Sequence, residues 1–163
     1  MAYAGPPFTN TLDATTRRRH MRKILRVAFA VVLGFVVGSA VNMGIIMVSG
    51  KIIPPPAGAD VTTMEGLKAS LHLFEAKHFL LPFLAHALGT VVGAFVAALL
   101  GPSMSIAPAY AVGVLFLLGG IASVSLLSGP AWFNTVDLVF AYLPAAWLGQ
   151  TLSGFVRRRH GGV

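Results

Sequence analysis

The chain has 163 residues, of which 56% are hydrophobic and only 10% are charged, and its formal net charge is +7. Soluble domains carry about 25% charged residues, so this chain has too little charge to cover a surface that faces water. We therefore expect lipid to surround most of its side chains. The sequence has no cysteine, which excludes disulfides, thiolate catalysis and Cys-ligated metals.

The basic residues lie in two runs that flank apolar segments. They are Arg17, Arg18, Arg19, Arg22, Lys23 and Arg26 in the first run, and Arg157, Arg158 and Arg159 in the second. Basic flanks of apolar spans are topology signals, and anionic lipid headgroups are their natural partners. The pattern favours the lipid bilayer as the partner and argues against nucleic acid.

Four apolar segments are long enough to cross the ~30 Å of hydrocarbon as helices, which takes about 20 residues each. They cover residues 27–48, 79–100, 107–127 and 132–156. Backbone groups in lipid must be hydrogen-bonded internally, so these segments are predicted to be helices rather than open strands. We predict an all-α membrane protein, a four-transmembrane-helix bundle over residues 24–156, with basic tails at 1–23 and 157–163. The first span exceeds the apolar core of a signal peptide, about 7–15 residues, and is predicted to be retained.

The distribution of Lys and Arg predicts the orientation. Nine basic residues lie in the two basic runs, whereas the outer loop (about residues 49–70) and the start of the second helix hold only Lys51, Lys68 and Lys77. Positive residues stay on the cytoplasmic side. We predict a multi-pass protein of the cytoplasmic (inner) membrane with both termini in the cytoplasm.

The second helix is predicted to begin outside the bilayer. Thr62 and Glu65 have the spacing of a capping box, which favours a helix start there and an interfacial segment near residues 64–73. Pro82 follows inside the apolar span. A proline in a helix interior removes a hydrogen bond, so Pro82 is predicted to kink this helix and to free a carbonyl near His78.

Small residues recur at four-residue spacing on three of the spans, which allows helices to approach closely. They are Gly34 and Gly38 on the first span, Gly89, Gly93 and Ala97 on the second, and Ala141, Ala145 and Gly149 on the last. The pattern favours packing within the bundle, and an oligomer interface is the alternative. On the last span, Tyr142 and Trp147 are predicted to pack inside the bundle.

Several polar residues lie within the spans, where an ionisable residue is a functional-site hypothesis by default. The candidates are Asn42, Glu75, His78, His86, Asn134 and Asp137, all predicted in the outer half of the bundle. Without any function, these side chains can form hydrogen bonds with one another or with water. His86 can then bond to Asn42, to Ser123 or to the carbonyl that Pro82 frees. Three functional readings stay open: a metal site formed by His72, Glu75 and His78, proton or ion movement through Glu75, His86 and Asp137, and haem or quinone contact at His78 or His86.

The stretch from His72 to Thr90, which follows Pro54, Pro55 and Pro56, resembles a segment of a family of uncharacterised bacterial four-helix integral membrane proteins. The resemblance implies a bacterial cytoplasmic membrane. It implies no activity.

The sequence has no phosphate-binding loop, no His-Glu-x-x-His and no serine nucleophile elbow. We therefore predict a non-enzymatic accessory or scaffold component without a cofactor, acting as a homo-oligomer or in a larger membrane complex. The alternative is a small oligomeric transporter or channel with a polar site in the outer half. An enzyme acting on lipids is the third possibility.

Overall fold

The computed structural model describes residues 9–102 and 105–160, and every regular element in this part of the chain is helical. In chain order the elements are α1 (Thr9–Ile52), α2 (Met64–Ser70), the 3₁₀ turns η1 (Leu71–Leu73) and η2 (Ala76–Phe79), α3 (Leu80–Leu100), α4 (Ala107–Leu127), α5 (Ala131–Phe140) and α6 (Leu143–His160). Three helical stretches, Ala14–Ile52, Ala76–Leu100 and Ala107–Leu127, are long and apolar enough to cross a membrane. The prediction of an all-α membrane protein is confirmed.

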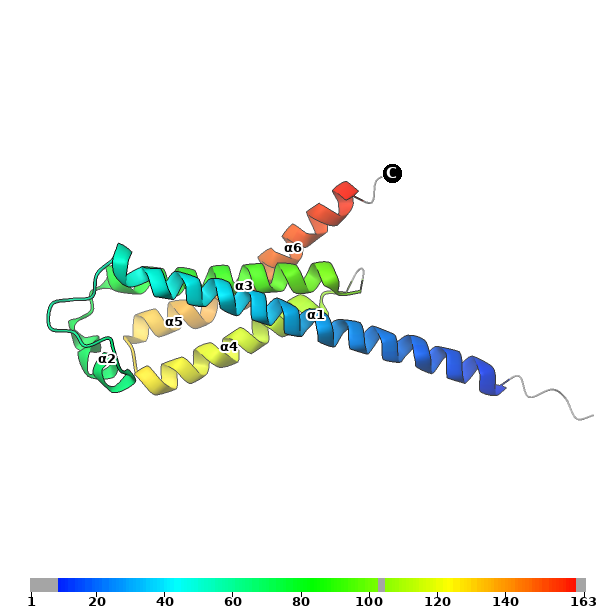
Figure 1. Cartoon of the computed structure of the whole chain (residues 1–163), viewed down its shortest axis with the longest axis horizontal. Helices are drawn as coiled ribbons and strands as arrows, with labels where there is room; N and C mark the ends of the chain where they lie inside the picture. The colour runs from blue at the N-terminus through cyan, green and yellow to red at the C-terminus, as the bar shows by residue number, and fades with distance from the viewer. Residues whose placement is uncertain (1–8, 103–104, 161–163) are drawn as a thin grey trace, which may run out of the picture.

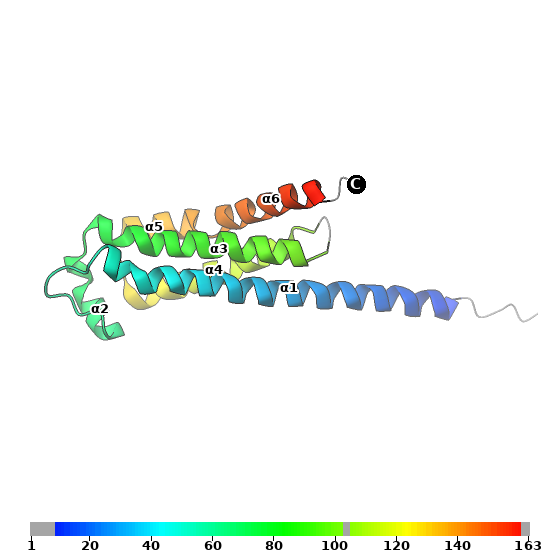
Figure 2. The same cartoon turned by 45° about the horizontal axis from the view of Figure 1, so that its top comes forward.

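The helix α3 is the centre of the bundle, because it packs against α1, α4 and α6. The longest contact is with α1, which runs beside α3 in both views (Figures 1 and 2). The N-terminal part of α1 extends beyond the other helices. The N-terminal end of α1 and the C-terminal end of α6 both lie at the end of the bundle opposite to α2 (Figure 1). We refer to the two ends of the molecule as the α2 end and the terminal end.

The interior is built from small residues, and many of the largest apolar side chains point outward. The residues with no exposed surface include Ala30, Ala85, Ala94, Ala97, Ala109 and Ala146. By contrast, Phe29, Met47 and Leu118 expose 63%, 73% and 57% of their surface. This arrangement suits a bundle in lipid, where close packing of small residues rather than burial of large apolar ones drives helix association.

The predicted packing glycines form the crossing of α1 and α3. A Cβ added to Gly34 would lie 2.5 Å from the carbonyl oxygen of Gly93 and 2.7 Å from the Cβ of Ala97. One added to Gly38 would lie 2.5 Å from the carbonyl oxygen of Gly89. Since side chains there would collide with backbone atoms, only glycine permits this approach. The small-residue rows of both helices therefore serve packing within one chain.

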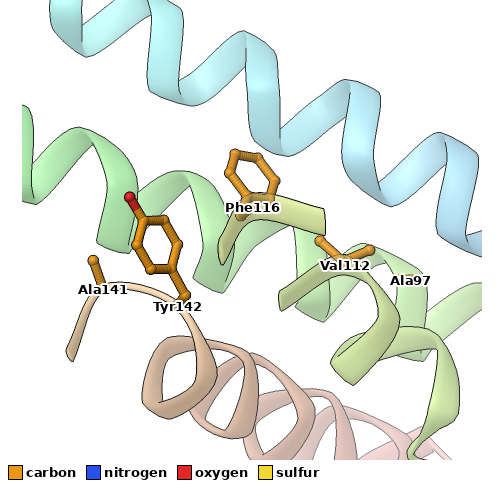
Figure 3. Close-up of a cluster of buried hydrophobic side chains, with 5 residues drawn as sticks. All are labelled: Ala97, Val112, Phe116, Ala141 and Tyr142. Atoms are coloured by element: carbon orange, nitrogen blue, oxygen red, sulfur yellow. The ribbon is translucent and has the colours of Figure 1, made fainter. Parts of the chain in front are cut away.

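A cluster of buried side chains lies between α3, α4 and the turn that joins α5 to α6 (Figure 3). It consists of Ala97, Val112, Phe116, Ala141 and Tyr142. Tyr142 is 1% exposed, in agreement with its predicted place inside the bundle. The same prediction for Trp147 is wrong, because Trp147 is 58% exposed.

The last predicted span, 132–156, is divided into α5 and α6, and the prediction of one continuous helix there is wrong. Pro144 explains the division. A helical Pro144 would lack the N–H that bonds the carbonyl of Phe140, and its ring would collide with that carbonyl. The chain therefore turns at Ala141 and Tyr142, and α6 begins at Leu143 with Pro144 in its first turn, where a missing N–H is tolerated.

The segment before α3 also differs from the prediction. The capping residue is Thr63 rather than Thr62, and its hydroxyl accepts a hydrogen bond from the N–H of Gly66 at 2.9 Å. The segment 64–79 then forms α2 and two 3₁₀ turns instead of an extension of α3. Because α3 begins at Leu80, Pro82 lies in its first turn, where N–H groups have no partner within the helix. The predicted interior kink at Pro82 is therefore wrong.

At the terminal end, two arginines bind the last carbonyls of α3, which have no partner within the helix. Arg157 Nη2 donates to the carbonyl oxygens of Ala98, Leu99 and Gly101, the latter two at 3.0 and 3.1 Å. Arg26 Nε donates to the carbonyl oxygen of Leu100 at 2.9 Å. One residue from each basic run therefore caps α3 and ties α1 and α6 to its end.

We expect Arg157→Ala to lower the free energy of unfolding by about 1.5–3 kcal/mol, the usual value of a hydrogen bond from a charged donor. Denaturant titration in detergent micelles measures it. Arg158→Ala is the matched control, because it removes the same charge from an exposed neighbour and should change stability by less than about 0.5 kcal/mol. Equal effects of the two substitutions would contradict the capping role.

Candidate functional site

Three polar side chains from different elements meet inside the bundle towards its α2 end. His86 comes from α3, Asp137 from α5, and Tyr142 from the turn between α5 and α6. His86 Nδ1 lies 2.8 Å from Asp137 Oδ1, and the Tyr142 hydroxyl donates to Asp137 Oδ2 at 2.6 Å. The same hydroxyl lies 3.2 Å from His86 Nδ1, and the two rings stack with centroids 5.9 Å apart. We refer to these three residues as the His86 triad.

The local sequence explains how the triad is held. Thr90, one turn after His86, is fully buried and its hydroxyl donates to the His86 carbonyl at 2.7 Å. Gly120 of α4 leaves the space that the Tyr142 hydroxyl occupies, because a Cβ at Gly120 would collide with it. The turn that Pro144 imposes brings Tyr142 beside Asp137. The triad therefore depends on the turn between α5 and α6, on the space left by Gly120, and on the hydrogen bond from Thr90 to the His86 carbonyl.

The side chain of Asp137 is 3% exposed, against 21% for His86. An isolated buried carboxylate costs several kcal/mol, so buried charges are found paired and hydrogen-bonded. Both oxygens of Asp137 have such partners. The triad is therefore stable only as a unit, which fixes the position of the His86 ring.

Two cavities adjoin His86. The larger, about 260 Å³, lies between α1 and α4, and we call it the α1–α4 cavity. The smaller, about 50 Å³, lies nearer the α2 end. The lining residues of the larger are Phe35, Asn42, His86, Leu115, Phe116, Gly119, Gly120, Ser123 and Tyr142. The smaller is lined by Leu71, Phe79, His86, Gly120, Ser123, Val124, Leu127, Gly129, Phe133, Asn134 and Asp137.

The α1–α4 cavity opens on the outer surface of the bundle, since its wall residues Phe35 and Leu115 are 37% and 41% exposed. Most of its wall is apolar. Within the described part of the chain, His86 Nε2 and the side chains of Asn42 and Ser123 have no hydrogen-bond partner. An apolar pocket with a few convergent polar groups is the usual form of a small-molecule site.

Of the other predicted site residues, Asn42 and Asn134 line the cavities beside the triad, whereas Glu75 and His78 line neither cavity. Glu75 is exposed and pairs with Lys77 at 2.9 Å. The Lys77 ammonium hydrogen-bonds the Glu75 carboxylate and so holds its pKa below the usual range. His78 accepts a hydrogen bond from the Glu75 N–H at 3.0 Å and caps η2. Asn134 donates to the Gly129 carbonyl at 3.0 Å and lines only the smaller cavity.

The proposed metal ligands His72, Glu75 and His78 are not brought together. His72 Nδ1 lies 2.8 Å from the carbonyl oxygen of Ala69, and all three side chains are in exposed or partly exposed turns. Over the described residues, no group of three or more His, Asp or Glu side chains is placed to hold a metal ion.

Two members of the site were missed at the level of sequence, because the prediction gave Tyr142 no polar role and Thr90 none at all. Ser123 was predicted as a possible partner for His86, whose actual partners are Asp137 and Tyr142. A signal for Tyr142 exists in the sequence. Pro144 follows it by two residues and Asp137 precedes it by five, so a break in the helix was needed to bring the two polar groups together.

Ser123 and His86 line both cavities, which raises the question of nucleophilic catalysis. No hydrogen bond joins them, whereas a serine nucleophile is activated by a base within about 2.6–3.2 Å. Ser123 also lies inside α4, where the backbone N–H groups are used by the helix and cannot bind an oxyanion. The arrangement suits binding better than acyl transfer.

Comparison with known proteins adds no relative: no protein-family model, no curated protein and no solved structure matches the chain. The resemblance to bacterial four-helix membrane proteins therefore stays a prediction.

Proposed function

We propose that the chain crosses the bacterial cytoplasmic membrane four times, with both termini in the cytoplasm. The ends of α1 and α6 lie at the same end of the bundle, which supports an even number of crossings (Figure 1). α5 and α6 together supply the fourth crossing, because their 10 and 18 residues amount to a rise of about 42 Å. Both basic runs lie at the terminal end, where anionic headgroups of the cytoplasmic leaflet would meet them.

Within this topology, we propose a non-enzymatic accessory component that binds a small, mainly apolar molecule with one polar end. The observation that carries the proposal is the α1–α4 cavity, which opens towards the surrounding lipid. Its polar groups include His86 Nε2 and the Asn42 side chain, which have no hydrogen-bond partner within the described part of the chain. Its position towards the α2 end corresponds to the outer leaflet. The ligand would enter sideways from that leaflet.

A role as oligomeric transporter or channel has less support in the geometry. Beyond His86 towards the terminal end, the helices meet in the apolar cluster of Ala97, Val112 and Phe116. The closely packed crossing of Gly34 and Gly93 lies beside it. A transported ion would need polar groups along this part, so passage would have to run between copies of the chain. Association with itself or with a larger membrane complex remains part of the proposal.

The test is photolabelling in phosphatidylcholine nanodiscs with decanol that carries a diazirine on its chain. The hydroxyl both donates and accepts, so this probe suits either state of His86. We expect labelled peptides from α1 and α4 around Phe35 and Phe116. Gly119→Leu should reduce this labelling about tenfold, because its side chain fills the cavity while its Cβ meets no atom within 4 Å.

Gly44→Leu is the matched control. Its Cβ also meets no atom within 4 Å, and Gly44 lies on α1 outside the cavity lining. Labelling should be unchanged in this variant. Labelling spread evenly over all lipid-facing helices, or equal in the two variants, would refute binding in the α1–α4 cavity.

A further inference from the structure

The chemistry of the α1–α4 cavity indicates which class of ligand it takes, an inference that rests on the proposed binding function. The argument begins with the proton on His86. Nδ1 faces Asp137 Oδ1 at 2.8 Å, so Nε2 is the ring nitrogen left for the cavity. Whether Nε2 donates or accepts depends on how many protons the His86 and Asp137 pair holds.

A net charge on the pair is costly, because Asp137 is only 3% exposed and the pair lies inside a bundle that the proposed topology places in lipid. The neutral pair has two forms. Either an imidazolium faces a carboxylate, or a neutral imidazole accepts from a protonated carboxyl through Nδ1. In both forms the second ring nitrogen carries a hydrogen. Nε2 is therefore a donor in the neutral pair, and the ligand must present an acceptor such as a carbonyl oxygen.

The charge of the cavity argues against an anionic head. No Lys or Arg is among the residues that line it. A carboxylate or phosphate placed against the neutral pair would leave one uncompensated negative charge in a medium of low dielectric constant, which costs several kcal/mol. The polar end of the ligand is therefore an uncharged acceptor, which excludes fatty acids and phospholipid headgroups.

The walls of the cavity suit a flat ring. They carry the rings of Phe35, Phe116, Tyr142 and His86. Phe35 and Phe116 lie 5.2 Å apart between centroids and are tilted by 54°, and His86 stacks on Tyr142. Aromatic groups favour offset or edge-to-face contact with another ring. At about 260 Å³ the cavity is just below the ~300–1,000 Å³ of drug-sized sites, so it takes one ring rather than a whole lipid.

From these features we propose that the α1–α4 cavity binds the head ring of a lipid-soluble quinone. One quinone carbonyl accepts from His86 Nε2. The amide of Asn42 and the hydroxyl of Ser123 are the other donors within the cavity, and they suit the second carbonyl. The apolar tail leaves between α1 and α4 into the lipid. The proposal concerns binding and includes no electron transfer.

The test is competition against the diazirine-decanol label in the same nanodiscs. The competitors are a decyl-substituted benzoquinone, decanoic acid and decane, which share the chain and differ in the head. We expect the quinone to displace the label at a concentration at least about tenfold lower than either of the others, the effect of one hydrogen bond to a favourable partner. Equal competition by all three would overturn the quinone assignment while leaving the binding function intact. Absence of cavity labelling by the probe itself would refute the binding function.

Two further measurements assign the contact to His86. Addition of the quinone should shift the ¹⁵N resonance of His86 Nε2, whereas decane should not. The double variant His86→Leu and Asp137→Leu removes the donor without leaving a carboxylate alone in the bundle. It should weaken quinone competition about tenfold, whereas the decanol label should persist because its hydroxyl can still bond the side chain of Asn42 or Ser123. Unchanged quinone competition in a double variant that retains its cooperative unfolding transition would overturn the contact.

Discussion

Gly38→Leu is expected to separate α1 from α3 and to lower the free energy of unfolding by at least ~3 kcal/mol. The Cβ of any residue at 38 would lie 2.5 Å from the carbonyl oxygen of Gly89 and 3.0 Å from the Cα of Gly93. Both are backbone atoms, which cannot turn aside as the end of a side chain can. Relief therefore requires the whole of α1 to move away, and the longest helix contact of the bundle is lost.

Stability in this series is measured by steric trapping or denaturant titration in bilayer-like micelles. Gly44→Leu is the control, since it places the same side chain on the same helix with no atom within 4 Å of its Cβ. We expect this control to unfold like the unmodified protein, or with slightly higher stability because leucine favours helix by up to ~1 kcal/mol over glycine. If Gly38→Leu were as stable as Gly44→Leu, the α1–α3 crossing would be wrong.

Asp137→Ala is expected to lower the free energy of unfolding by about 3–5 kcal/mol, the usual effect of removing one partner from a buried charge pair. It leaves the Tyr142 hydroxyl without its acceptor and His86 Nδ1 without its partner in the interior of the bundle. Tyr142→Phe removes one hydrogen bond but leaves the His86–Asp137 pair in place, so its effect should be nearer ~1 kcal/mol. Unfolding curves of the purified variants give both values.

A double-mutant cycle separates this pairing from simple packing. His86→Leu leaves the buried Asp137 without its imidazole partner, and Asp137→Leu leaves both the His86 ring and the Tyr142 hydroxyl unpaired. The double substitution removes both members of the pair and leaves only the Tyr142 hydroxyl unpaired. We expect the double variant to be more stable than the sum of the single effects predicts, by at least ~1 kcal/mol, because residues in one hydrogen-bonded network are coupled. Strictly additive effects would show that the two side chains are not partners in the folded protein.

The structure also gives the two basic runs a second role. Arg26 and Arg157 bind the last carbonyls of α3 from two different helices. In the proposed topology, these two arginines therefore have two roles: their positive charge favours the cytoplasmic side, and their hydrogen bonds cap the end of α3 on that side. The remaining arginines, Arg158 and Arg159 among them, are exposed and free to meet lipid headgroups.

The helical spans could be predicted from sequence because apolar length is a local property. The third predicted span, 107–127, has the bounds of α4, and the second, 79–100, begins one residue before α3. The same approach failed at Pro144. The apolar composition of residues 132–156 predicted one continuous helix, but a single proline without an N–H divides it into two. It failed again at Pro82, whose effect depends on where the helix begins.

By itself, the sequence determined that lipid surrounds this protein, where its long helices run, and which glycines let helices approach. Each of these follows from a property of one continuous segment: its composition, its apolar length or the spacing of its small residues. Only the tertiary structure decided that His86 meets Asp137, 51 residues away, and that Glu75 and His78 lie apart from them. The physical reason is that a buried polar group is stable only with a partner in reach. Which groups come within reach is set by the crossing of α1 with α3 and by the break between α5 and α6.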